Sequence, residues 1–143
     1  MPDPLSGSCL CGAIRYTVSA PITELRACHC THCQKASGAN GSVNAVIPAS
    51  AFNLLQGAPK RLGTAADSGR TLYRYFCGGC GSPLYSHRAT TPETYALRVG
   101  TLDNPPAVKI TTNIWTRSAR PWDIIDPATK QFPGQPDAPA PAK

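Results

Sequence analysis

The chain has 143 residues, the size of one ordinary domain. Hydrophobic residues make up 41% of it, enough for a core, and no apolar run approaches the roughly 18 residues needed to span a membrane. The formal net charge is +6, but the basic residues are scattered, with no run denser than Lys60-Arg61, so we expect no nucleic-acid partner. The start, Met1-Pro2-Asp3-Pro4, lacks the basic and apolar regions of a signal peptide. We therefore expect a cytoplasmic protein without a membrane partner, in a reducing compartment where thiols stay available.

The first half of the chain predicts short strands and one helix. Residues 1–8 are expected to form a flexible lead. Residues 31–37 predict a short helix that ends at Gly38, because glycine tolerates the left-handed conformation of a helix cap. Alternating or β-forming residues predict three strands, over residues 13–18, 25–28 and 42–47.

The second half continues the pattern of strands. Residues 51–55 and 60–64 suggest a strand pair around Gly57. Four further strands are predicted over residues 71–76, 83–86, 95–99 and 108–115. Many short strands separated by glycine and proline indicate an all-β domain. The end of the chain is rich in proline and alanine, so we expect one domain over residues 1–133 and a disordered tail over residues 134–143.

The seven cysteines fall into three tight clusters, Cys9-x-Cys11, Cys28-x-Cys30-x2-Cys33 and Cys77-x2-Cys80. A disulfide framework has an even number of cysteines at wider intervals, whereas closely spaced thiols suit a metal ion. The clusters therefore predict metal sites, and the sulfur ligands favour zinc.

The first and third clusters predict a closed zinc site. On a strand, Cys9 and Cys11 would point to one face and present two sulfurs to one ion. The segment Cys77-Gly78-Gly79-Cys80-Gly81 has the composition of a tight metal-binding turn. Together the two pairs supply four thiolates, which is the ligand set of a structural zinc. The alternatives are that one pair is incidental or that a reversible disulfide forms.

The middle cluster predicts a zinc site of three thiolates. His29 lies between two ligands and should point away from the ion, whereas His32, or His87 from elsewhere in the fold, could supply a fourth ligand. The preferred interpretation leaves the fourth position to water or to an incoming thiolate, and the alternative is a second structural zinc. Three thiolates make zinc a weak activator of water, so thiol chemistry fits Cys28, Cys30 and Cys33 better than hydrolysis.

The cysteine clusters and their surroundings strongly resemble the glutathione-dependent formaldehyde-activating enzyme (GFA) family, of the Mss4-like superfamily. The resemblance extends over about residues 5–133 and is carried by the order of the three clusters. The matching segments are Gly7-Ser8-Cys9-Leu10-Cys11-Gly12, Cys28-His29-Cys30-Thr31-His32-Cys33 with the following Gln34-Lys35-Ala36-Ser37-Gly38, Phe76-Cys77-Gly78-Gly79-Cys80-Gly81-Ser82, Val99-Gly100-Thr101-Leu102-Asp103, and Trp122 after Arg-Pro.

The resemblance implies a fold and two zinc sites. The fold would be Mss4-like, with folded antiparallel sheets, a zinc-ribbon-like structural site and little helix. The resemblance permits a homodimer. It implies two Zn²⁺ per chain, a structural ion on Cys9, Cys11, Cys77 and Cys80 and a catalytic ion on Cys28, Cys30 and Cys33.

On this basis the leading hypothesis is a zinc-dependent carbon–sulfur lyase or synthase, of the S-(hydroxymethyl)glutathione synthase type. It would act on the adduct of glutathione, or another small thiol, with an aldehyde or related electrophile. His29 or His32 could shuttle the proton. The candidate clamps for the carboxylates of glutathione are Lys35, Arg88, Arg117 and Arg120, and Trp115 and Trp122 are expected to be core anchors.

Two other functions fit the same clusters. One is a non-enzymatic zinc-binding module that interacts with other proteins. The other is a redox module in which the middle cluster alternates between zinc-bound and oxidised forms.

Overall fold

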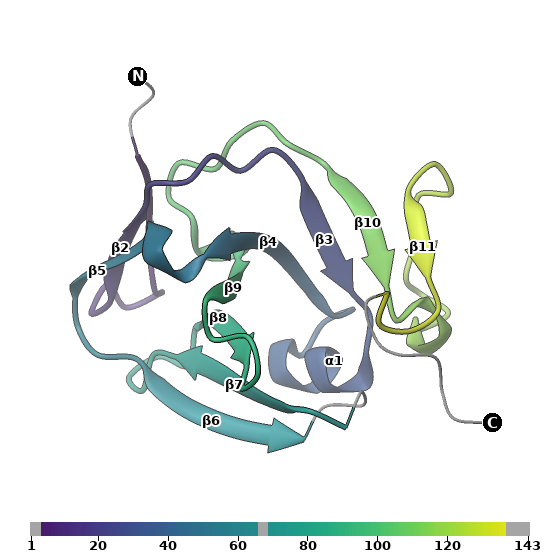
Figure 1. Cartoon of the computed structure of the whole chain (residues 1–143), viewed down its shortest axis with the longest axis horizontal. Coiled ribbons are helices and arrows are strands. Elements are labelled where there is room, and N and C mark those ends of the chain that lie inside the picture. Colours follow the sequence, from purple (N-terminus) through teal and green to yellow (C-terminus); the bar gives the residue numbers. More distant parts are fainter. Residues whose placement is uncertain (1–3, 66–68, 137–143) are drawn as a thin grey trace.

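The structure of the chain is a computed structural model, which describes residues 4–65 and 69–136 (Figure 1). These residues form one α-helix, eleven strands and three short 3-10 helices. The helix is α1 (Thr31–Ser37), and the 3-10 helices are η1 (Ala49–Ala51), η2 (Val99–Thr101) and η3 (Thr116–Ser118). The strands are β1 (Leu5–Ser8), β2 (Arg15–Val18), β3 (Leu25–Cys28), β4 (Ser42–Pro48), β5 (Phe52–Gln56), β6 (Lys60–Ala65), β7 (Thr71–Phe76), β8 (Pro83–Arg88), β9 (Thr94–Arg98), β10 (Ile110–Ile114) and β11 (Lys130–Phe132).

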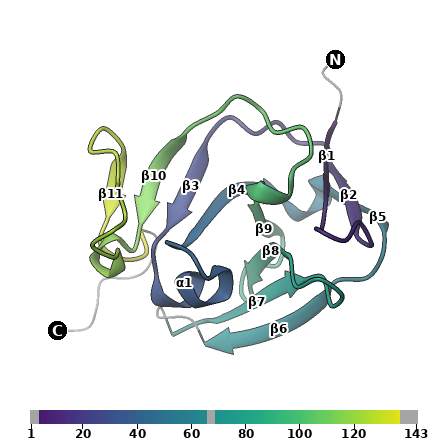
Figure 2. The same ribbon diagram turned by 180° about the vertical axis from the view of Figure 1, so that it is seen from behind.

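The strands form two sheets, and the all-β prediction with little helix is confirmed. The smaller sheet has the order β1-β2-β5, and the larger has the order β11-β10-β3-β4-β9-β8-β7-β6. Figures 1 and 2 show the larger sheet curving around α1, with β3 and β4 on one side of the helix and β6 and β7 on the other. Most neighbouring strands are antiparallel, but β10 runs parallel to both β3 and β11.

The N-terminal segment differs from the predicted flexible lead. Leu5–Ser8 is a strand, β1, that pairs antiparallel with β2 and also bonds to a distant loop, where the Ser6 amide donates to Asn104 Oδ1 at 2.8 Å. The lead was a wrong prediction for these residues because their partners lie further along the chain. The alternation predicted for residues 13–18 is present, with Tyr16 and Val18 buried in β2. The first three residues of the predicted lead lie outside the described residues.

The expected strand pair around Gly57 is also wrong. Both strands exist, but β5 pairs with β2 in the smaller sheet and β6 pairs with β7 in the larger one. Gly57 follows β5 and packs against the segment before β2, since a Cβ atom there would lie 2.5 Å from the Ala13 carbonyl oxygen. The turn therefore carries the chain from one sheet to the other instead of closing a hairpin.

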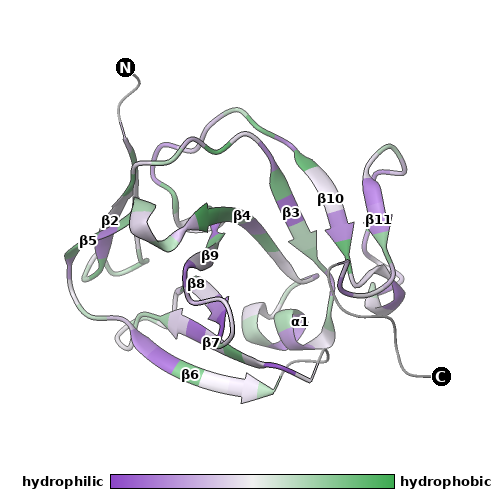
Figure 3. Cartoon of the chain, viewed as in Figure 1, coloured by the Kyte–Doolittle hydropathy of each residue, from purple (hydrophilic) through white to green (hydrophobic). Residues whose placement is uncertain are grey.

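The parallel strands β10 and β11 bring late residues to the end of β3. The register places Asn113 beside Ala27 and Ile114 beside Cys28. Figure 3 shows β3 as hydrophobic except for one hydrophilic band, the position of Arg26. Residues two apart on a strand point to the same face, so Arg26 and Cys28 lie on one face of the sheet. This face carries some of the candidate site residues described below.

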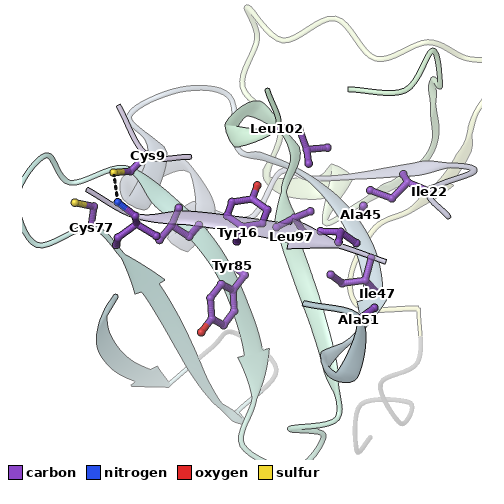
Figure 4. Packing of buried hydrophobic residues seen from close by; sticks show 13 residues of the cluster. Cys9, Tyr16, Ile22, Ala45, Ile47, Ala51, Cys77, Tyr85, Leu97 and Leu102 are labelled. Carbon is purple, nitrogen blue, oxygen red and sulfur yellow. Dashed lines mark hydrogen bonds between the residues drawn. The ribbon is translucent and has the colours of Figure 1, made fainter. Parts of the chain in front are cut away.

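Two separate groups of buried hydrophobic residues hold the fold. The larger surrounds Tyr16, Leu84 and Leu97, and the sulfurs of Cys9 and Cys77 lie together at one end of it (Figure 4). The smaller consists of Cys28, Cys30, Cys33, Ile114 and Trp115.

The two tryptophans differ in their surroundings. Trp115 is a core residue, as expected. The same expectation for Trp122 is wrong, since 71% of this residue is exposed. A turn closed by the Asp123 amide and the Arg120 carbonyl oxygen, 2.9 Å apart, turns Asp123 inward and leaves Trp122 on the surface.

The C-terminal part of the described chain packs against Trp115. The Trp115 amide donates to the Gly134 carbonyl oxygen at 3.3 Å, and its indole Nε1 donates to Gln135 Oε1 at 3.2 Å. Most of the tail predicted over residues 134–143 lies outside the described residues. In the ranges that the structure covers, no helix has the length and apolar character that crossing a membrane requires.

Candidate metal centres and adjoining cavities

The sulfurs of Cys9, Cys11, Cys77 and Cys80 come together from two tight turns. The prediction that Cys9 and Cys11 lie on a strand is wrong. Both lie in the turn after β1, where the Gly12 amide donates to the Cys9 carbonyl oxygen at 3.0 Å. The second pair lies between β7 and β8, where the Gly81 amide donates to the Cys77 carbonyl oxygen at 2.8 Å. A tight turn can direct two sulfurs to one point as well as a strand can. The predicted group of four cysteines is therefore present although the local structure differs.

The geometry of this group fits a tetrahedral zinc ion. Zinc–sulfur bonds of about 2.3 Å place the corners of a tetrahedron about 3.8 Å apart. The Cys9 and Cys11 sulfurs are 3.6 Å apart, and those of Cys11 and Cys77 are 3.7 Å apart. Hydrogen bonds support the sulfurs, since the Ile14 amide donates to Cys9 Sγ at 3.3 Å and the Gly79 amide donates to Cys77 Sγ at 3.4 Å. The structure holds these thiols without a disulfide, and the four could hold a metal ion.

Cys28, Cys30 and Cys33 form the second group, at the junction of β3 and α1. Cys28 ends β3, and Cys30 is the N-cap of α1, its sulfur accepting a hydrogen bond from the Cys33 amide at 3.3 Å. The helix ends at Gly38 in the left-handed conformation, as predicted. The three sulfur atoms lie within 4.8 Å of one another, and in residues 4–65 and 69–136 no histidine or carboxylate joins the group. The three buried thiolates could hold a soft metal ion such as zinc.

A chain of hydrogen bonds reaches this group from a buried part of the sheet. Arg98 Nη1 donates to Asn44 Oδ1 at 2.6 Å, Asn44 Nδ2 donates to Ser42 Oγ at 2.9 Å, and Ser42 Oγ donates to Cys33 Sγ at 3.2 Å. The register makes the chain possible, because Arg98 on β9 lies directly opposite Asn44 on β4. A cation thus acts through two polar side chains on one sulfur, which orients and stabilises the thiolate.

The three sulfurs have unequal pKa values. Hydrogen bonds from Cys28, Cys30 and Ser42, together with the charge of Arg98, lower the pKa of Cys33 far below its ordinary value. The nearby sulfurs of Cys30 and Cys33, and then burial, raise the pKa of Cys28. Three thiolates so close together repel one another, so a bound cation is needed to hold all three in the charged form.

His29 lies between two of these cysteines, but its ring faces a polar network. Nδ1 is 2.5 Å from Asp123 Oδ2 and Nε2 is 2.8 Å from Asn113 Oδ1. Asn113 presents its oxygen to the ring because its Nδ2 donates to Thr129 Oγ1 at 2.7 Å. Both ring nitrogens therefore face oxygen acceptors, and His29 links the cysteine loop to β10 and to the segment after η3. The sequence indicated neither Asn113 nor Asp123, because 84 and 94 residues separate them from His29.

Three cavities meet at Cys33, and they differ in character. The first has a volume of about 480 Å³ and lies between α1 and strands β6 to β8. Another, of about 310 Å³, extends over β3, β4, β8 and β9, and both Cys28 and Cys33 line it. A small cavity of about 70 Å³ touches all three cysteines. Cys33 lines all three cavities, so this residue marks the place where they meet.

The polar lining of these cavities is strongly cationic. Of the described residues that line them, none is an aspartate or a glutamate, whereas five are arginines, namely Arg26, Arg70, Arg74, Arg88 and Arg98. Nε of Arg74 is buried and has no hydrogen-bond partner in the described part of the chain. Such a lining favours an anionic ligand.

Of the four predicted clamps, only Arg88 lines these cavities. Lys35 is exposed on α1, Arg117 lies over the Trp115 ring with Cζ 4.8 Å from the ring centre, and Arg120 Nε donates to Gln34 Oε1 at 2.7 Å. Sequence analysis missed Arg26, Arg74 and Arg98. Each stands among apolar neighbours in a predicted strand, in Leu-Arg-Ala, Tyr-Arg-Tyr and Leu-Arg-Val, and this is the signal that could have found them.

Comparison of the sequence with known protein families identifies the family of this chain. The family model described as glutathione-dependent formaldehyde-activating enzyme matches residues 4–118. The chain belongs to this GFA family.

Two fungal relatives carry the name of this enzyme. A Sordaria macrospora protein is 36% identical over 74 residues, which is 52% of this chain and 30% of the relative. An Emericella nidulans protein is 31% identical over 77 residues, which is 54% of this chain and 38% of the relative. The match thus spans only about a third of the length of these curated relatives.

A solved structure has a fold similar to that of this chain. The crystal structure of a Rhodobacter sphaeroides protein aligns with a TM-score of 0.58 and 23% sequence identity, covering 74% of this chain and 99% of that one. The family match agrees with the resemblance that the cysteine clusters carry, and the likeness to the solved structure concerns the fold alone.

Proposed function

We propose that this GFA protein binds two Zn²⁺ ions and catalyses formation or cleavage of a carbon–sulfur bond between a small thiol, glutathione, and an aldehyde. The ion on Cys9, Cys11, Cys77 and Cys80 would be structural, and the one on Cys28, Cys30 and Cys33 catalytic. The observation that carries the proposal is the group of three buried sulfurs at the meeting point of cavities lined by arginines. The family match supports glutathione as the thiol.

The donor set favours thiol chemistry. When bound by three thiolates, zinc can hold a further thiol as its nucleophilic thiolate. Three thiolates around a divalent ion already leave a net negative charge, and a fourth doubles it. Arg98, through Asn44 and Ser42, and Arg74, which lines the first and smallest cavities, offset this charge at Cys33.

In the synthetic direction, the sulfur of glutathione adds to the carbonyl carbon of the aldehyde. The new bond joins sulfur to carbon, the carbonyl π pair moves to oxygen, and the proton lost by the thiol ends on that oxygen. The product is a hemithioacetal, and neither an oxidant nor a reductant is needed. Because thiols add to aldehydes readily without a catalyst, the contribution of the protein is mainly proximity and orientation.

The arginines would bind and orient the carboxylates of glutathione. Arg26, Arg88 and Arg98 line the same 310 Å³ cavity as Cys28 and Cys33. Arg26 and Arg98 lie on either side of Asn44 in the register of β3, β4 and β9. A guanidinium group binds a carboxylate through two parallel hydrogen bonds, which fixes the position of the ligand as well as its charge.

The proposal is tested by exchange spectroscopy of glutathione with formaldehyde and, separately, with butanal, each with and without the zinc-loaded protein. We expect faster exchange between free and adduct forms with at least one of the two aldehydes. Native mass spectrometry should count two zinc ions per chain. A single zinc, or exchange no faster than in buffer with both aldehydes, would refute the proposal.

Two variants test whether Arg88 binds glutathione in the cavity or affects its affinity only through the net charge of the protein. Arg88→Ala should weaken glutathione binding roughly tenfold, because it removes a charge-assisted hydrogen bond. Lys35→Ala is the matched control, since it removes one positive charge from the exposed face of α1. Equal affinities of the two variants would contradict the assignment of the carboxylate site.

A further inference from the structure

The part of the 480 Å³ cavity that is not shared with the other two cavities is lined mainly by apolar and aromatic side chains. Its side chains include Val43, Leu62, Tyr75, Phe76, Pro83 and Tyr85. Its volume lies within the range of about 300–1,000 Å³ that is usual for sites that enclose small organic molecules. A one-carbon aldehyde would leave most of this space unfilled.

The polar residues of this cavity mark where it meets its neighbours. Cys33, Ser42 and Arg98 also line the 310 Å³ cavity, and Arg74 also lines the smallest one. The six apolar and aromatic residues line neither of the other two cavities. The lining therefore changes from cationic to apolar across Cys33.

Two hydroxyl groups near the cavity are already bonded. Ser37 Oγ donates to the Gly41 carbonyl oxygen at 2.7 Å, and Tyr75 Oη is 3.1 Å from His87 Nε2. Leu62 lies directly opposite Arg74 in the β6–β7 pair, so both side chains extend to the same side of the sheet. The apolar part of the cavity thus offers a ligand contact area but few free polar groups.

We infer that this cavity binds the hydrocarbon part of the electrophile, so that the substrate is an aldehyde with an apolar alkyl or aryl group larger than one carbon. The inference rests on the proposed function, in which the thiol occupies the arginine-lined side of Cys33. The thiol's carboxylates and the aldehyde's apolar group then lie on opposite sides of the sulfur. The carbon–sulfur bond forms where the two cavities meet.

The direct test uses stable thioethers that mimic the adduct. Isothermal titration of the zinc-loaded protein with S-methylglutathione and S-butylglutathione compares ligands that differ by three methylenes. Each buried methylene should tighten binding about fourfold, so full burial of three gives about sixtyfold. Equal affinities of the two thioethers would overturn the inference.

A pair of leucine variants makes the test specific to the cavity. Leu62→Ser should reduce the gain from the butyl group and leave S-methylglutathione binding unchanged, and its 56% exposure makes the change compatible with folding. Leu55→Ser is the matched control, a leucine on β5 that is 66% exposed and lines none of the three cavities. Loss of the chain-length effect in both variants, or in neither, would contradict the assignment.

A ligand without a thiol separates failure of the inference from failure of the proposed function. Addition of n-hexanol, with methanol as control, should shift the amide resonances of Val43, Leu62 and Phe76. Hexanol shifts together with no binding of S-methylglutathione would count against the proposed function but support the apolar cavity. Binding of S-methylglutathione without a chain-length effect or hexanol shifts would overturn only the inference.

Discussion

Replacement of Asp123 by alanine should destabilise the protein substantially. The carboxylate is 2.5 Å from His29 Nδ1, and both side chains are only 7% exposed. The variant leaves a buried ring nitrogen without its partner, which costs about 3 kcal/mol, at the lower end of the range for breaking a buried ion pair. For a domain of this size each kcal/mol lowers the melting temperature by roughly 3–4 °C, so we expect a decrease of about 10 °C.

The same variant should also loosen the second metal group. His29 lies between Cys28 and Cys30, and its two hydrogen bonds fix the loop that carries their sulfurs. The assay is thermal unfolding of zinc-loaded protein, followed by zinc release to a chromogenic chelator. We expect one zinc to be released faster and the other to be retained.

Asp126→Ala is the control for this experiment. Asp126 lies in the same segment and is exposed, and its carboxylate accepts a local hydrogen bond from the Ala128 amide at 2.9 Å, whereas its bonds from Thr129 go to the backbone carbonyl oxygen, which alanine keeps. It should cost less than about 1 kcal/mol. If Asp123→Ala melts within about 2 °C of the unmodified protein, the network around His29 does not hold the loop and the reasoning fails.

Three further predictions follow from single contacts. Ser42→Ala removes the hydroxyl that donates to Cys33, so a chelator should take zinc from the second group faster, while the stability of the domain changes little. An unchanged rate of zinc release would contradict the role of the hydrogen-bond chain from Arg98. Gly41→Ala should prevent correct folding around β3, because its Cβ would overlap the Cys28 carbonyl oxygen. In Gly38→Ala the new Cβ meets nothing within 4 Å, so the variant should lose only about 1 kcal/mol of stability. Circular dichroism of the two variants tests this difference. Trp115→Ala should cost about 3–5 kcal/mol and Trp122→Ala less than about 0.5 kcal/mol in chemical denaturation, and similar losses would show that burial does not separate them.

Sequence patterns were sufficient for features that local chemistry determines. The spacing of the cysteines anticipated both groups of sulfurs that the structure brings together. The helix over Thr31–Ser37 and its end at Gly38 follow from residues within one short segment. The alternation in β2 likewise predicted which of its side chains are buried.

Partners distant in sequence could not be predicted in this way. The residues of β5 indicate a strand but not whether it pairs with β2 or β6. In the sequence Asp123 is an ordinary polar residue next to Trp122, and nothing local indicates that it meets His29. The arginines of β3, β7 and β9 reach the cysteines only through the order of strands in the larger sheet.

The two sulfur groups also differ in how the fold holds them. Cys9 and Cys77 are 4% and 3% exposed and pack into the main hydrophobic cluster, so an ion there would be held by the same packing that holds the domain. Cys28, Cys30 and Cys33 share a cluster with only two other buried residues and adjoin three cavities. If the second group admits a substrate, as we propose, core packing cannot enclose it, and polar side chains must fix it instead. Such contacts are made by Ser42 directly and by Asn113 and Asp123 through His29. These residues come from distant strands and loops, because a site that is open to ligands has few packed side chains around it.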